Sequence, residues 1–146
     1  MGAKVRGAAL ALLGRRDYTA AELRQRLIDK EHPRDEVDEE IAQLIEDRTI
    51  NDRRVATAHI RVASQIKGRG RLRIRQELAA RGIDRRLADE LIAELPAEDE
   101  SAAIAKFLAR KRFPASPTSL ERQKIYQQLL RKGFTGDAIG KALGRK

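Results

Sequence analysis

The sequence predicts an all-α protein built from three tandem three-helix repeats, each a helix-turn-helix-like unit, arranged in an elongated and curved array. Two observations predict this fold class. Apolar residues recur every three to four positions, with no sustained alternation of period two. One pattern of residues also returns twice at a spacing of 51 residues. Each unit is small for an independent domain, so neighbouring units are expected to support one another.

The repeat is visible in three segments that align without gaps: LRQRLIDKEH from Leu23, IRQELAARGI from Ile74 and IYQQLLRKGF from Ile125. So many matching columns do not arise together by chance, and we interpret them as a triplication with units 1–50, 51–97 and 98–146. The matching apolar columns are Leu23, Ile74 and Ile125; Leu27, Leu78 and Leu129; His32, Ile83 and Phe134; Val37, Ala88 and Ile139; and Ile41, Ile92 and Leu143.

The helices of each unit follow in the same order. The spacing predicts a first helix over residues 3–13, 52–66 and 99–112 of the successive units. Thr19 is expected to cap the second helix of the first unit, because Glu22 three residues later completes a capping box.

The ends of the second helices and the starts of the third helices are also marked. Gly82 and Gly133 are expected to end the second helices of units two and three, since glycine adopts the left-handed conformation at little cost. Pro33 is expected in the first turn of a third helix, and Asp84 and Thr135 as N-caps of the other two. Nine helices result.

Charge divides the chain into two parts. Thirty-one Lys and Arg residues against 22 Asp and Glu residues give a net charge of +9. The first unit carries 9 basic and 11 acidic side chains, the second 11 and 6, and the third 11 and 5, so the net charges are −2, +5 and +6. The positive field on units two and three favours polyanionic or acidic partners.

Composition also bounds the location of the protein. The chain has no Cys, which excludes disulfides and thiolate metal sites and fits a reducing cytosol. The apolar stretch within residues 1–13 is too short to span a bilayer. We therefore expect a soluble cytoplasmic protein without a membrane segment, and a monomer, since no further apolar stripe is evident.

The residues that catalysis requires are scarce. Only two histidines are present: His32 is expected to pack in the column that it shares with Ile83 and Phe134, and His59 to have a structural role in its helix. The acidic run over residues 35–40 spreads around a helix, so we expect a solvated face, not a metal site. We predict that the protein is not an enzyme and needs no cofactor or metal.

The basic residues are the candidate partner-binding surface, for acidic protein or for phosphates. The densest run alternates with other residues after Gly68, so its first members are expected in a turn before a helix. The alternative is a solvated helix start with snorkelling arginines. The candidate residues are Lys67, Arg69, Arg71, Arg73, Arg75, Arg110, Lys111, Arg112, Lys124, Arg131 and Lys132.

Three blocks of the sequence, ALALLGRRDYTAAELRQRL, LIEDRTINDRRVATAHI and GRGRLRIRQELAARGI, resemble the RecX family of bacterial regulatory proteins, which consist of three tandem three-helix repeats. The resemblance runs from Ala8 to Leu143. Local departures are Asn51 where Asp is usual, Val55 where an aromatic residue is common, and Glu31 where the helix-ending glycine is usual.

The resemblance implies a role in DNA repair, homologous recombination and the SOS response. It implies a negative modulator of the RecA recombinase that binds the RecA filament on single-stranded DNA, in its helical groove, and inhibits ATP hydrolysis, strand exchange and filament growth. The basic residues would then face RecA or make an auxiliary contact with single- or double-stranded DNA. The alternative from charge alone is a helix-turn-helix-like DNA-binding protein that acts without RecA. Because aromatic side chains are few, base stacking is weakly supported.

Overall fold

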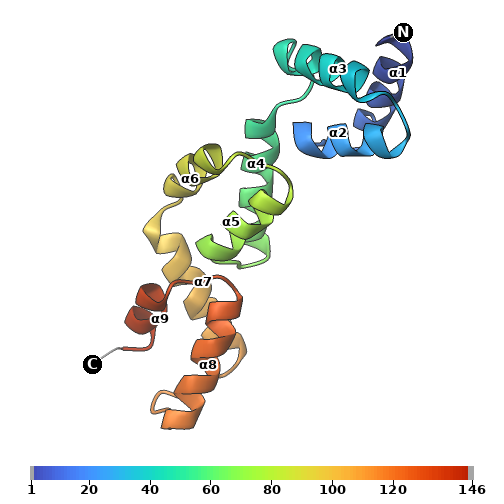
Figure 1. Ribbon diagram of the computed structural model, residues 1–146. Helices are drawn as coiled ribbons and strands as arrows, with labels where there is room; N and C mark the ends of the chain where they lie inside the picture. Colours follow the sequence, from blue (N-terminus) through green and yellow to red (C-terminus); the bar gives the residue numbers. More distant parts are fainter. Residues whose placement is uncertain (1, 145–146) are drawn as a thin grey trace.

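The computed structural model describes residues 2–144, and this part of the chain contains helices and connecting turns but no strand (Figure 1). None of the helices in this part is long and apolar enough to cross a bilayer. The elements are α1 (Gly2–Leu13), α2 (Ala20–Asp29), α3 (Arg34–Glu46), α4 (Asp52–Arg61), the π-helical turn η1 (Val62–Ile66), α5 (Arg71–Ala80), α6 (Arg85–Ala93), α7 (Ala97–Arg110), α8 (Ser119–Arg131) and α9 (Gly136–Ala142).

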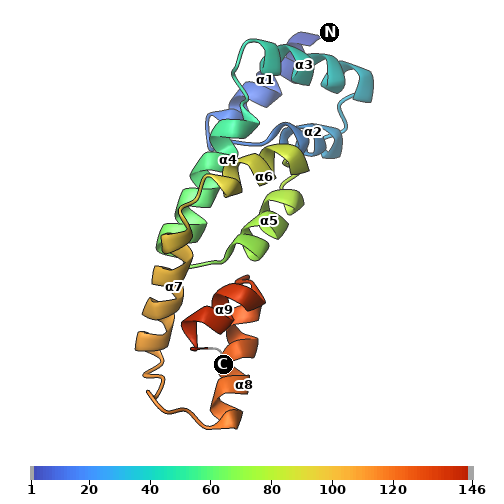
Figure 2. The same cartoon turned by 90° about the vertical axis from the view of Figure 1, so that its left-hand side faces the viewer.

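The helices form three groups of three that follow one another along an elongated, curved molecule (Figures 1 and 2). In Figure 2, α4 and α7 run nearly end to end along one edge, and the other helices of units two and three lie on the same side of that column. The predicted fold class, an extended array of three three-helix repeats, is therefore confirmed.

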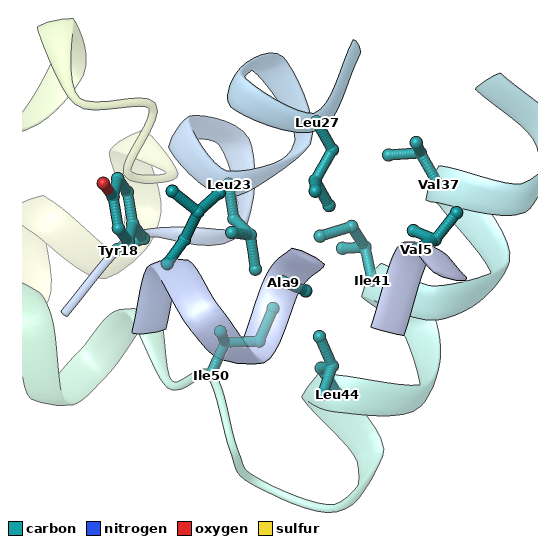
Figure 3. Packing of buried hydrophobic residues seen from close by; sticks show 10 residues of the cluster. Val5, Ala9, Tyr18, Leu23, Leu27, Val37, Ile41, Leu44 and Ile50 are labelled. Atoms are coloured by element: carbon teal, nitrogen blue, oxygen red, sulfur yellow. The ribbon is translucent and has the colours of Figure 1, made fainter. Parts of the chain in front are cut away.

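Each group has a hydrophobic core of its own. In the first core, side chains from α1, α2 and α3 point toward a common centre, and Ile50 closes one end (Figure 3). Leu23, Leu27 and Val37 are completely buried there. The other cores hold the equivalent repeat positions, among them Leu78 and Leu129, and also exclude water completely from those two side chains. Burial of this apolar area is the main stabilising contribution to each unit.

The turn that ends each second helix explains one repeat column. The residue after the helix takes a left-handed conformation, with φ of +67° at Glu31, +79° at Gly82 and +95° at Gly133. The next amide then reaches back five residues, which also brings its side chain against the helix. These closing hydrogen bonds join the amide of His32 to the carbonyl of Leu27 (3.2 Å), Ile83 to Leu78 (3.0 Å) and Phe134 to Leu129 (3.2 Å).

The helix caps lie at or next to the positions that the sequence predicts. The Thr19 hydroxyl accepts a hydrogen bond from the Glu22 amide (3.0 Å), and the Glu22 carboxylate accepts one from the Thr19 amide (2.9 Å), which completes the predicted capping box. Asp84 and Thr135 cap α6 and α9 as expected. Pro33 lies one position earlier than predicted, at the N-cap of α3 and not in its first turn.

Two first helices differ from their predicted form. The helix expected over residues 52–66 widens into the π-helical turn from Val62 onward, a feature frequent at functional sites. The helix expected over residues 99–112 begins at Ala97 and ends at Arg110. Arg112, at φ +53°, belongs to another left-handed closing turn, and helix periodicity alone does not distinguish such a turn from one more helical turn.

The acidic run on α3 is not a uniformly solvated face. Asp35, Asp38 and Glu39 are exposed as expected, but the side chain of Glu40 is only 8% exposed. Its carboxylate accepts a hydrogen bond from the Arg6 guanidinium at 2.7 Å. The prediction was wrong for Glu40, because the run covers more than one turn and one of its members must face α1.

Candidate functional site

The basic run after η1 lies where the sequence placed it, in a turn that leads into α5, but most of its charge has internal partners. Arg69 and Arg73 both form ion pairs with the Glu77 carboxylate. Arg75 lies 2.8 Å from the Asp89 carboxylate. Lys67 is exposed, and within residues 2–144 its ammonium forms no ion pair. The run is therefore less free to bind a partner than its composition suggests.

Arg71 joins units two and three. Its guanidinium donates a hydrogen bond to the carbonyl of Leu95 at 2.6 Å, and its backbone amide donates one to the Glu100 carboxylate at 3.0 Å. Leu95 lies at the end of unit two and Glu100 in the first turn of α7. Arg71 thus holds the connection between the two units.

The basic residues of unit three are more open. Arg110, Lys111 and Arg112 lie at the end of α7, and all three are exposed. Lys124 and Arg131 are also exposed on α8, seven residues apart and so on one face of that helix. These side chains give the last unit a positively charged surface.

A cleft of about 440 Å³ brings part of this charge together at the junction of units two and three. Its basic lining comes from three separate segments: Lys67 after η1, Lys106 and Arg110 on α7, and Lys132 at the end of α8. Asp99 is the acidic residue in the lining. Lys106 was not among the predicted residues, although its position four residues before Arg110 places both on one helix face.

The environment of Lys132 reflects this concentration of charge. Partial burial lowers the pKa of its ammonium, and the nearby positive charges of Arg110, Arg73, Arg69 and Lys111 lower it further. The ammonium also lies 5.1 Å from the centre of the Phe107 ring, within range of a cation–π interaction. An anion in the cleft would reverse the effect of the like charges.

The units are joined by equivalent contacts. The Thr19 hydroxyl donates a hydrogen bond to the carbonyl of Arg81 at 2.6 Å, and 51 residues later the Gly70 amide donates one to the carbonyl of Lys132 at 2.8 Å. At each junction the start of one second helix therefore docks on the end of the next second helix. The predicted ends at Gly82 and Gly133 lie at these docking points.

The first junction has a closed network of opposite charges. The Arg81 guanidinium donates hydrogen bonds of 2.9 and 3.1 Å to the two oxygens of Glu22. His59, half-buried as a structural residue, lies 2.9 Å from Glu77 through Nε2 and 3.4 Å from Arg81 through Nδ1. Within residues 2–144 no cluster of His, Asp and Glu suited to a metal ion is found.

The Glu22 carboxyl is expected to make this junction sensitive to acid. Burial raises its pKa, but hydrogen bonds from Arg81 and the Thr19 amide and the charges of Arg81 and Arg16 outweigh burial, so the pKa lies below the ordinary 4.5. The unfolded chain therefore takes up this proton at higher pH than the folded chain, and stability falls as the pH drops below about 4.5. Urea unfolding across this range should show a weaker pH dependence for Glu22→Gln, and an unchanged dependence would contradict the assignment.

Family models match the chain in three consecutive segments. The first three-helix domain of RecX matches residues 6–44, the second matches residues 51–92 and the third matches residues 98–143. The chain belongs to the RecX family. The family membership that the three sequence blocks indicate is thus confirmed.

Whole-length relatives agree with the domain matches. The Regulatory protein RecX of Haemophilus influenzae (strain 86-028NP) is 34% identical over 92% of this chain and 89% of its own length. That of Trichlorobacter lovleyi is 30% identical over 90% and 88%. The crystal structure of RecX from Lactobacillus salivarius superposes with a TM-score of 0.89 at 25% identity and covers 98% of this chain and 94% of that one.

Proposed function

We propose that this RecX-family protein is a negative modulator of RecA. It binds the RecA filament on single-stranded DNA, in the helical groove, and inhibits ATP hydrolysis, strand exchange and filament growth. The observation that carries the proposal is the match along nearly the full length of proteins named Regulatory protein RecX. In this role the protein acts by binding, without chemistry of its own, as a monomer in the bacterial cytoplasm where RecA works.

The shape and the charge distribution support this role. An extended array can contact successive subunits of a filament, which a compact protein of 16.4 kDa reaches less easily. Its first unit has a net charge of −2 and the other two have +5 and +6. Such polarity would orient the array in a charged groove.

The DNA-binding alternative rests on the net charge of +9. In a helix-turn-helix reader the last helix of a unit enters the major groove. In unit one that helix is α3, where exposed Asp35, Asp38 and Glu39 would repel phosphates. DNA contact is therefore proposed as auxiliary and confined to units two and three.

Titration of the protein into RecA of the same organism on single-stranded DNA tests the proposal, with ATP hydrolysis as the readout. We expect inhibition at ratios well below one molecule per RecA and no hydrolysis by the protein alone. Folded protein without effect at any ratio would overturn the proposal. Tight binding to DNA without RecA, with steep weakening by salt, would then favour the alternative.

A charge-reversal pair tests the exposed face of α8 in the same assay. Lys124→Glu with Arg131→Glu should raise the inhibitory concentration about tenfold, since both side chains lie on one positive surface. The matched control is Arg85→Glu with Arg86→Glu, an exposed pair on α6. Equal losses in both double variants would show a dependence on net charge and would remove α8 as a specific contact.

A further inference from the structure

The two junctions between units allow a direct comparison, because the repeat relates them residue by residue at a spacing of 51. In the first junction two carboxylates balance the positive groups: Glu22 pairs with Arg81, and Glu77 with His59. The equivalent positions in the second junction have different charges. Glu22, His59, Glu77 and Arg81 correspond to Arg73, Arg110, Gln128 and Lys132.

The second junction docks at the equivalent positions but lacks the two carboxylates of the first. At the first junction the Thr19 hydroxyl donates to the Arg81 carbonyl at 2.6 Å. At the second junction two backbone amides donate, Gly70 to the Lys132 carbonyl at 2.8 Å and Leu72 to the Gly133 carbonyl at 2.9 Å. Both Glu positions have been replaced, one by a cation and one by a neutral amide. Partial burial lowers the pKa of Lys132 and the positive charges nearby lower it further, whereas at the first junction Arg81 faces a carboxylate.

The unbalanced charge is not required by the packing. The first junction shows that docking at the equivalent positions accepts an internal salt bridge. Glu77 neutralises Arg69 and Arg73, but within residues 2–144 no ion pair is formed by Lys67, Lys106, Arg110 or Lys132. Like charges held close together in this way cost stability. Two further lysines, Lys67 and Lys106, line the cleft beside Lys132 and Arg110, and Asp99 is the acidic group among the lining residues. The counter-ion that the fold lacks here is therefore expected from a ligand.

We propose that the cleft lined by Lys67, Lys106, Arg110 and Lys132 is a phosphate-binding site. Four positive groups and one carboxylate in the lining leave an excess of three charges. A phosphate monoester carries about −1.5 to −2 at neutral pH, so two linked phosphates come close to balancing that excess, whereas a single carboxylate does not. Lysine ammonium groups suit phosphate as compact point charges.

The phosphate can come from a free oligophosphate or from the backbone of a polynucleotide, and the chemistry recognised is the same. The volume of about 440 Å³ and the position between two units suit a compact anion that bridges them. A phosphate held there would bind residues of both α7 and the π-helical turn of unit two, and so would fix unit three against unit two. This inference does not depend on the RecA proposal, because it concerns an anion bound by the isolated protein.

The test introduces a carboxylate at the second junction by substituting one residue of the chain. Gln128→Glu is nearly isosteric and restores at the second junction the charge that Glu77 has at the first. It also lies one helical turn before Lys132, a favourable order for an ion pair. Gln127→Glu is the matched control, because it makes the same change at the preceding position of the same helix, which is exposed.

Binding of pyrophosphate is measured by isothermal titration calorimetry, with thermal unfolding of each variant as a check on folding. We expect Gln128→Glu to weaken binding about tenfold and to unfold no earlier than the unaltered protein. Gln127→Glu is expected to change the affinity by less than about twofold, since solvent and salt screen an exposed charge. Equal weakening in both variants would overturn the proposal. So would an unaltered protein that binds neither pyrophosphate nor a single-stranded oligonucleotide.

Two further ligands distinguish the source of the phosphate and its chemistry. A single-stranded oligonucleotide that binds with the same difference between the two variants, when pyrophosphate does not bind, would support a phosphate site for a polynucleotide backbone. Polyglutamate serves as the acidic-protein probe. If it binds as tightly as the phosphate ligands and shows the same dependence on Gln128→Glu, the cleft is a site for acidic protein and the phosphate assignment is wrong.

Discussion

Replacing Gly133 by alanine is expected to detach unit three from unit two and to cost about 3 kcal/mol or more of folding stability. Gly133 has φ of +95°, which is strained for any residue with a side chain. A Cβ there would also lie under 3.0 Å from the Cβ, the Cα and the backbone nitrogen of Arg73. The backbone cannot move away cheaply, because the Gly133 carbonyl accepts the Leu72 amide at 2.9 Å.

Urea unfolding followed by circular dichroism measures this loss of stability. Alanine substitutions at two other glycines serve as comparisons with smaller expected costs. Gly82→Ala meets the Cβ of one residue, Ala21, under 3.0 Å away, so it should cost less than Gly133→Ala. Gly7→Ala has no atom within 4 Å and lies inside α1, so it should stabilise the protein by about 1 kcal/mol. Similar stability of Gly133→Ala and the unaltered protein would show that the junction is not held as described.

These glycines also show which structural features can be predicted from the sequence and which cannot. Their position after a helix predicts the left-handed turn, because that conformation is decided by the residue and its neighbours. Their second role, close contact with the preceding unit, depends on residues 60 or 61 positions away, Arg73 for Gly133 and Ala21 for Gly82. The repeat predicts that units are adjacent, but not which turn of one unit meets which helix of the next.

For the basic residues, too, some features can be predicted from the sequence and others cannot. The sequence predicts the sign of the charge on units two and three, and the run that begins at Lys67 does start in a turn. It does not reveal that Glu77 neutralises both Arg69 and Arg73, since those pairs depend on how the turn folds onto α5. Lys106 was missed because a single lysine on α7 is unremarkable until Lys132 is brought beside it.

Replacing Phe134 by alanine is expected to cost about 3–5 kcal/mol, because it empties a completely buried aromatic position. Phe134 follows the closing turn of α8 and packs in the core of unit three with Ile104 and Leu129. The core is small, so few neighbouring side chains can move to fill the cavity. Thermal and urea unfolding should both show the loss, and a cost under about 1 kcal/mol would contradict this packing.

His32 is the internal control for that prediction. It occupies the same column of the repeat, and its amide makes the same closing hydrogen bond at 3.2 Å, so the sequence predicts a packing role for both residues. The structure leaves His32 half-buried, whereas Phe134 is 0% exposed. His32→Ala should therefore cost about 1 kcal/mol or less. Since the closing turn is common to both sites, the difference between the two variants reports the size and burial of the deleted side chain, not the loss of the turn.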